Sequence, residues 1–273
     1  MRALQQQTKS KVGLIAYDVI AKGTNAVRAR IGSQRSEGVR LAIADAISDA
    51  DLYVLGEACA DHKLITGGSG IALGLPVNFR TASLLPETGP ASDLPVIAGK
   101  SVVLSGSASK ATNEQVAQWR ATRPSFRVEP LALWRGEPVV AQAVEFATKH
   151  QDEPVLIYAT STPEEVKAVQ KELGGGKAGH LVEQALASIA RELRNTGVRK
   201  FVIAGGETSG AVVQALDVKS LRIGAQIDPG VPATQSIGED PVALALKSGN
   251  FGAKDFFVRA LKALNGFSGH DDR

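Results

Sequence analysis

The chain has 273 residues, of which 44% are hydrophobic and 22% charged, enough to bury the cores of two modest domains. Its 31 basic and 28 acidic side chains nearly cancel, and no run of Lys and Arg is interleaved with aromatic residues, which excludes the electrostatic footprint of nucleic-acid binding. The single cysteine, Cys59, excludes an intramolecular disulfide and is expected to be a small buried hydrophobe. Because of this single cysteine we expect a cytoplasmic protein, and because no apolar stretch approaches the ~20 residues of a membrane span we expect a soluble one.

The first part of the chain, residues 11–80, alternates between short apolar runs and amphipathic segments, the pattern of βαβ units in a parallel sheet. The expected elements are strands at 12–16, 41–46 and 64–66, helices at 26–34 and 51–60, and a further helix after a glycine turn at 67–70. These three strands are fewer than the ~5 to 6 of a typical sheet. We therefore expect an α/β domain whose sheet is incomplete.

A proline-rich stretch without sustained periodicity follows, and it favours an interdomain linker at 83–99. The predicted first domain is then 1–82, and the predicted second domain is 100–273. In the second domain the expected strands lie at 101–104, 126–131, 154–158, 201–204, 221–223 and 243–247, and the expected helices at 113–121, 138–149, 163–196 with a break at 174–176, 208–216 and 255–264. The fold class expected is α/β, with two domains and mainly parallel sheets.

The segment 200–216 is typical of a buried strand, a glycine turn and an amphipathic helix in one unit. Gly205 and Gly206 supply permissive backbone, and Thr208 or Ser209 is expected to cap the helix. The exposed amides and the positive end of the helix dipole would then suit a phosphate group. The alternative is an ordinary turn of an α/β unit that binds nothing.

Two further loops follow predicted strands of the same domain. One, at 247–255, is rich in glycine, and the other, at 104–115, is rich in hydroxyl groups that could cap a helix or bind phosphate. Each alone could be a plain helix-entry turn. Three such loops in one domain favour a ligand site, because ligands of open α/β sheets bind at the carboxyl ends of the strands.

Several familiar fingerprints are absent. Gly99-Lys100-Ser101 imitates the end of a P-loop but is predicted to open a strand, and no Gly-x-Ser-x-Gly elbow of an α/β-hydrolase exists. The histidines lack the spacing of metal ligands, so we expect them at the surface and expect no metal site in the protein alone. They are His62, His150, His180 and His270.

In the first domain, the loop 67–70 follows a predicted strand and could donate amides to a carboxylate or phosphate. Tyr17, Asp18 and Asp45 lie at or beyond the ends of neighbouring strands and would point to the same edge. The alternative is that each of these is a turn or cap residue.

Taken together, six stretches of the chain resemble the four-carbon acid sugar kinase family, most closely its 3-oxo-tetronate 4-kinases. They are residues 11–19, 64–79, 105–107, 204–210, 226–232 and 245–252, which span nearly the whole chain. The resemblance implies an N-terminal substrate domain and a C-terminal nucleotide domain. It also implies an enzyme, a phosphotransferase that uses ATP and Mg²⁺ to phosphorylate the terminal C4 hydroxyl of a four-carbon sugar acid such as 3-oxo-tetronate.

The resemblance further implies which residues contact the two ligands. Those that would contact ATP are Ser105, Ser107, Gly205, Gly206, Glu207, Thr208, Ser209, Gly249, Asn250, Phe251 and Gly252. Those that would face the sugar acid are Gly67, Gly68, Ser69 and Gly70. Backbone amides, Mg²⁺ and Lys247 are the candidates for neutralising the phosphate charge.

The chain departs from this family in two places. Family members are longer and open with a strand and an Asp-Asp-containing loop that forms part of the substrate site, and nothing here matches that loop; Ala233 stands where an aromatic residue is common. The catalytic base is therefore unassigned, and we expect the first domain to lack its N-terminal part. Two interpretations stay open, a sugar-acid kinase and a catalytically silent nucleotide-binding remnant of one. A homodimer is left open, whereas nucleic acid and membrane are not expected as partners.

Overall fold

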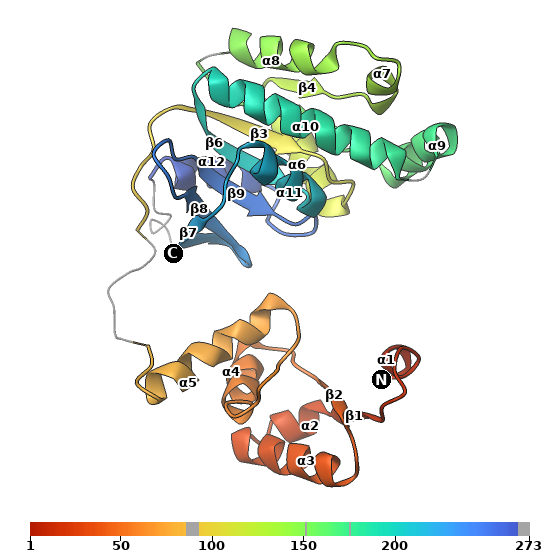
Figure 1. Ribbon diagram of the computed structural model, residues 1–273, viewed down its shortest axis with the longest axis vertical. Helices are drawn as coiled ribbons and strands as arrows, with labels where there is room; N and C mark the ends of the chain where they lie inside the picture. The colour runs from red at the N-terminus through yellow and green to blue at the C-terminus, as the bar shows by residue number, and fades with distance from the viewer. Residues whose placement is uncertain (86–92, 151, 175, 267–273) are drawn as a thin grey trace. The chain divides into compact units, whose positions relative to one another are not determined.

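The computed structural model describes residues 1–85, 93–150, 152–174 and 176–266 (Figure 1). The chain divides into two compact units, Met1–Gly89 and Pro90–Arg273. Each unit has its own sheet and its own hydrophobic core, which confirms the α/β class with mainly parallel sheets. Within the described ranges, no helix has the length and apolar character that crossing a bilayer would need.

The first unit is built around two short parallel strands. Its elements are α1 (Arg2–Gln5), β1 (Val12–Ile15), α2 (Tyr17–Ile20), α3 (Thr24–Ser36), β2 (Leu41–Ala44), α4 (Asp49–Ala58), the 3₁₀ helix η1 (Ser69–Gly74) and α5 (Leu75–Thr81). Strands β1 and β2 pair in register from Val12 opposite Leu41. Ile15, Ile20 and Val27 pack with residues of α4 to form a small core.

Two expectations for this unit are wrong. Residues 64–66 form no strand, so the described part of the unit has two strands and not three. Leu64 is 83% exposed, because no neighbouring strand pairs with this short apolar run. Cys59 caps the C-terminal end of α4 and is half-buried, not buried in the core, and its partial burial raises the pKa of its thiol.

The second unit carries a larger sheet. Its elements are β3 (Lys100–Ser105), α6 (Lys110–Arg120), β4 (Ser125–Arg127), α7 (Pro130–Trp134), α8 (Val139–Lys149), β5 (Val155–Tyr158), α9 (Pro163–Leu173), α10 (Lys177–Asn195), β6 (Val198–Ala204), α11 (Gly206–Ala215), β7 (Leu221–Asp228), β8 (Val231–Ser236), β9 (Ala243–Lys247) and α12 (Phe256–Leu264). The strand order is β4-β5-β3-β6-β9-β8-β7. The first five strands are parallel, while β8 pairs antiparallel with both β9 and β7.

Helices cover both faces of this sheet (Figure 1). Side chains of β3 alternate, so that Val102 and Leu104 pack with α8, α10 and α11, whereas Val103 packs with α6 and α12. A parallel sheet that is covered on both faces explains why its strands read as continuous apolar runs. The predicted break at 174–176 is confirmed, since Gly174 and Gly176 both adopt positive φ between α9 and α10.

Two details of the second unit correct the sequence-based expectations. Strand β8 was not predicted, because Thr234, Gln235 and Ser236 give it the composition of a loop although all three are buried. The strand expected at 126–131 ends at Arg127, since Pro130 begins α7, where its fixed φ suits the first helical turn.

Candidate functional site

Three loops meet at the carboxyl ends of the neighbouring strands β3, β6 and β9. The amide of Gly106, which follows β3, donates to the carbonyl oxygen of Ala204 in β6 over 3.0 Å. The amide of Gly205, which follows β6, donates to the carbonyl oxygen of Lys247 in β9 over 2.9 Å. The loops that begin at Gly106, Gly205 and Ser248 therefore lie side by side, at the edge where open α/β sheets bind ligands.

The N-terminal end of α11 presents unpaired amides at this edge. Gly205 is the N-cap residue, with a φ of 125° that favours glycine. The amides of Gly206, Glu207 and Thr208 in the first turn have no acceptor within the helix, and the helix dipole makes this end positive. An anion placed here would receive hydrogen bonds from the backbone itself.

The expected capping by Thr208 or Ser209 is wrong. The helix already begins at Gly206, so both residues lie inside its first turn, and no side chain caps it. Their side chains are buried instead, and the hydroxyl of Ser209 makes no hydrogen bond within the part of the chain that the structure describes. A cap must precede the helix that it caps, and here that place belongs to a glycine.

The glycines of the three loops differ in the space around them. A Cβ atom on Gly249 would lie 2.5 Å from Ser107 Oγ, and one on Gly106 would collide with Thr208 Oγ1. A Cβ atom on Gly206 would meet nothing within 4 Å apart from its chain neighbours and the backbone of its own helix. Gly106 and Gly249 are thus required for the loops to pack together, whereas the surface above Gly206 is open.

Helix α6 holds the loop that follows β9. Ser109 Oγ and Thr112 Oγ1 both donate to the carbonyl oxygen of Gly249, the latter over 2.8 Å. Gln115 Nε2 lies within hydrogen-bond distance of three carbonyl oxygens, those of Phe251 (3.1 Å), Gly252 (2.9 Å) and Ala253 (3.0 Å). The loop therefore turns its carbonyl groups toward the protein.

Lys247, the last residue of β9, lies beneath the same loop and is only 1% exposed. Its Nζ atom donates to Thr112 Oγ1 (2.8 Å), the carbonyl oxygen of Gly249 (2.9 Å) and that of Ser248 (3.3 Å). Burial without a carboxylate partner lowers the pKa of this ammonium to about 8. A positive charge is thus enclosed directly under the loop at neutral pH.

The two predicted serines of the first loop occupy different environments. Ser105 is fully buried, and its hydroxyl lies 2.6 Å from Thr160 Oγ1, so it faces the interior below the site. Ser107 is half-buried, and its Oγ accepts from the amide of Ser109 over 3.2 Å. Among the residues expected to contact nucleotide, Ser107 is thus nearer the surface of the site than Ser105.

The other predicted nucleotide residues lie in the three converging loops. Gly206, Glu207, Asn250 and Phe251 are exposed there, and Gly249 and Gly252 are half-buried. Sequence reasoning missed Gly106, Ser109, Thr112 and Gln115. Ser109, the N-cap residue of α6, and Thr112 and Gln115 within the helix stand three residues apart on one side of it, and this polar spacing is the signal that could have identified them.

The loop of the first unit has a different setting from the expected one. Gly67 and Gly68 follow an irregular segment and not a strand, and Ser69 begins η1. Tyr17 and Asp45 do meet at the carboxyl ends of β1 and β2, where the amide of Tyr17 donates to Asp45 Oδ2 over 3.2 Å. The structure therefore brings these two together, as the strand positions predicted.

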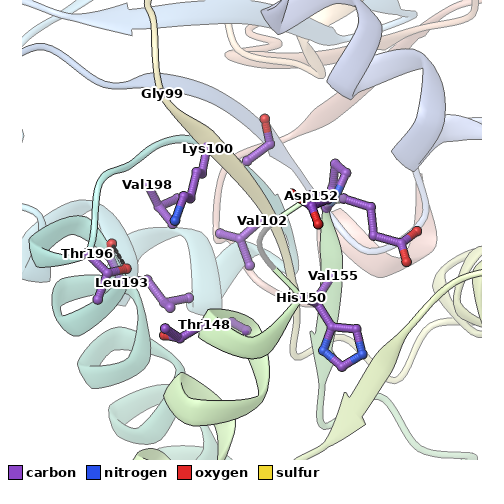
Figure 2. A pocket seen from close by; sticks show the side chains of 14 residues that line it. Gly99, Lys100, Val102, Thr148, His150, Asp152, Val155, Leu193, Thr196 and Val198 are labelled. Atoms are coloured by element: carbon purple, nitrogen blue, oxygen red, sulfur yellow. Dashed lines mark hydrogen bonds between the residues drawn. The ribbon is translucent and has the colours of Figure 1, made fainter.

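A cavity of about 280 Å³ lies at the opposite edge of the larger sheet, by the amino ends of β3, β5 and β6 (Figure 2). Lys100, His150 and Asp152 are among the residues that line it. The triplet Gly99-Lys100-Ser101 thus enters strand β3 instead of a helix, as predicted, and lies away from the three loops.

No group of His, Cys, Asp and Glu within the described ranges has the arrangement of a metal-binding site. His62 and His180 are exposed, and His150 is half-buried with its Nδ1 atom 2.8 Å from the carbonyl oxygen of Phe146. His270 falls outside the described residues.

Comparisons with known proteins match both units. A family described as a nucleotide-binding C-terminal domain matches residues 102–257, and one described as a sugar-binding N-terminal domain matches residues 1–75. A Burkholderia multivorans protein named 3-oxo-tetronate kinase is 69% identical over 266 residues, and a Cupriavidus necator protein of the same name is 64% identical over 267 residues. Each alignment covers 97% of this chain and 62% of the relative.

A solved structure agrees with these sequence matches. The crystal structure of the Haemophilus influenzae protein HI1011 superposes with a TM-score of 0.68 at 38% identity, covering 97% of this chain and 63% of that one. The chain therefore spans about three fifths of the length of the relatives that it matches.

Proposed function

The chain belongs to the four-carbon acid sugar kinase family, and on this basis we propose that it binds ATP with Mg²⁺ and transfers the terminal phosphoryl group to the C4 hydroxyl of a sugar acid such as 3-oxo-tetronate. In this proposal residues 100–273 bind the nucleotide, residues 1–82 bind the sugar acid through the loop 67–70, and residues 83–99 connect the two.

The observation that carries the proposal is the convergence of three loops at the carboxyl edge of β3, β6 and β9. The open surface above Gly206 and the unpaired first-turn amides of α11 suit the phosphate groups of a nucleotide. Catalysis of phosphoryl transfer requires mainly that the protein position the reactants and stabilise negative charge, and backbone amides can do both.

The residues present also fit a Mg²⁺ ion that arrives with the nucleotide. Mg²⁺ is usually held by one or two carboxylates, with phosphate oxygens and water completing its shell. Glu207 is exposed in the first turn of α11, beside the amides that would bind phosphate, and would supply such a carboxylate. When bound, the ion would offset the negative charge of the phosphates during transfer.

The test is calorimetric titration of the chain with ADP in the presence and absence of Mg²⁺, followed by an assay of ADP release from ATP. We expect Mg-dependent binding, and ADP release that rises when 3-oxo-tetronate is added. Binding without any sugar-acid-dependent release would favour the catalytically silent interpretation over a kinase. A chain that is folded but binds no nucleotide would contradict the proposal.

A further inference from the structure

Lys247 is an unusual residue to find inside this domain. Its hydrogen-bond partners in the described structure are a hydroxyl group and two carbonyl groups, and none is a carboxylate. Burying an ammonium without an opposite charge costs free energy, so the position needs a functional reason or compensation from its surroundings. Lys247 ends β9 and directly precedes the loop 248–253, so this loop is the part of the molecule that its ammonium group can influence.

The geometry of the ammonium argues against direct contact with phosphate. A lysine ammonium has three N–H bonds, and here three oxygen atoms receive them, those of Thr112, Ser248 and Gly249. All three acceptors belong to the protein. No N–H bond is left over to point out of the interior, where a nucleotide would lie.

Side chains of α6 also hold carbonyl groups of this loop. Thr112 donates to the carbonyl oxygen of Gly249, and Gln115 reaches those of Phe251, Gly252 and Ala253. The amides of Gly249 and Asn250, in contrast, make no hydrogen bond within the described part of the chain. The loop is thus arranged with carbonyl groups inward and amides available to an anion, which resembles an anion-binding nest.

We infer that Lys247 is a positioning residue for this loop, which holds the carbonyl oxygens of Ser248 and Gly249 inward so that the loop amides face the nucleotide phosphates. The inference rests on the proposed nucleotide function. Lys247 acts through Thr112 and the loop, and does not touch the phosphates. Its enclosed positive charge further strengthens the attraction of the loop for an anion, because the low dielectric of the interior screens it little.

The test is a double-mutant cycle on Mg-ADP affinity at pH 7, with the variants Lys247→Met, Thr112→Val and both together. We expect Lys247→Met to weaken binding by about 10- to 100-fold and Thr112→Val by a smaller factor, the range typical for loss of hydrogen bonds to a charged group. The double variant should bind no more weakly than Lys247→Met, because both substitutions remove the same support. Independent effects that multiply would indicate that Lys247 contacts the ligand by itself and would overturn the inference.

Lys219→Met is the matched control, since it removes the same charge from an exposed lysine beyond the C-terminal end of α11. Its affinity should stay within about twofold of the unmodified chain. Thermal unfolding separates positioning from simple destabilisation, because Lys247→Met should unfold at the same or a higher temperature while binding more weakly. If Lys247→Met does not fold, Thr112→Val decides, and unchanged affinity there overturns the inference.

Failure of the inference and failure of the proposed function give different results. If the unmodified chain does not bind Mg-ADP, the proposed function is wrong and the inference with it. If the unmodified chain binds and Lys247→Met binds equally well, only the inference is wrong.

Discussion

The amide of Gly205 donates to the carbonyl oxygen of Lys247 over 2.9 Å and so joins the turn before α11 to the end of β9. This bond fixes two of the three loops relative to each other before any ligand is present. A site whose donors are already oriented loses less entropy on binding than one that must be assembled.

Replacing Gly206 by Val should weaken nucleotide binding by at least about tenfold, or ~1.4 kcal/mol. The Cβ atom of the new side chain would meet nothing within 4 Å beyond its own turn, so we expect the side chain to occupy the space proposed for phosphate with little effect on the fold. Gly210→Val is the matched control, because Gly210 lies one turn further along α11 and has equally open surroundings. Calorimetry should find the control close to the unmodified chain, and equal affinities for both variants would remove this turn from the site.

Lys100→Ala should leave nucleotide affinity within about a factor of two. Lys100 stands at the entrance of β3, and the proposed phosphate loops follow the other end of that strand. The same titration with Mg-ADP measures this. A loss of ~100-fold, or ~2.7 kcal/mol, would mean that the phosphates bind at the edge shown in Figure 2.

The buried ammonium of Lys247 should make stability depend on pH. Burial lowers its pKa from 10.5 to about 8, so between these values the unfolded chain binds more protons than the folded one. The free energy of unfolding should therefore rise with pH across this window. At about 1.4 kcal/mol per pKa unit, and with the folded group still half-protonated at pH 8, the gain between pH 8 and pH 9.5 is about 1.5 kcal/mol.

Denaturant titration of the unmodified chain and of Lys247→Met at both pH values measures this difference. The variant should lack the gain, while Lys200, whose pKa is also lowered by burial, is present in both proteins and cancels. Parallel pH profiles for the two proteins would show that Lys247 keeps an ordinary pKa in the folded state.

Asp228→Ala should lower the free energy of unfolding by about 1–3 kcal/mol. Asp228 Oδ2 accepts from the amide of Ala253 over 2.9 Å and from Arg259 Nη1 over 3.0 Å, and so ties the end of the loop to β7 and α12. Glu145→Ala, which removes an exposed ion pair on α8, is the control and should change stability by ~0.5 kcal/mol or less. If Asp228→Ala and Glu145→Ala changed the free energy of unfolding equally in chemical denaturation, the hydrogen bonds of Asp228 would contribute no more than an exposed ion pair.

The sequence predicts local units well where glycine and apolar periodicity coincide. The turn at Gly205 and Gly206 was recognisable because a buried strand, two glycines and an amphipathic helix follow one another without interruption. Strand β8 was not, because two of its polar side chains find partners only when β8 pairs with β9: Thr234 Oγ1 donates to the carbonyl oxygen of Leu244 over 2.8 Å, and Ser236 Oγ accepts from the amide of Val242 over 2.8 Å. Polar composition predicts exposure only where such partners are absent.

The contacts between distant segments of the candidate site could not be predicted from the sequence. Lys247 and Thr112 are separated by 135 positions, yet Lys247 Nζ donates to Thr112 Oγ1 over 2.8 Å. No periodicity within either segment could indicate this pairing. The start of α11 was misjudged for a local reason, because Thr208 and Ser209 suit a cap by type while Gly205 occupies the cap position by conformation.

Amide hydrogen exchange with and without Mg-ADP tests most directly whether the three loops form a nucleotide site. The amides of Gly206, Glu207 and Thr208 at the start of α11, and those of Gly249 and Asn250, have no protein acceptor in the described structure, so they should exchange quickly in the free chain. Bound nucleotide should slow exchange in residues 106–109, 205–209 and 248–253 together, and leave residues 147–150 at the opposite edge unchanged. Protection confined to that opposite edge, or absent from the three loops at saturating nucleotide, would contradict the account.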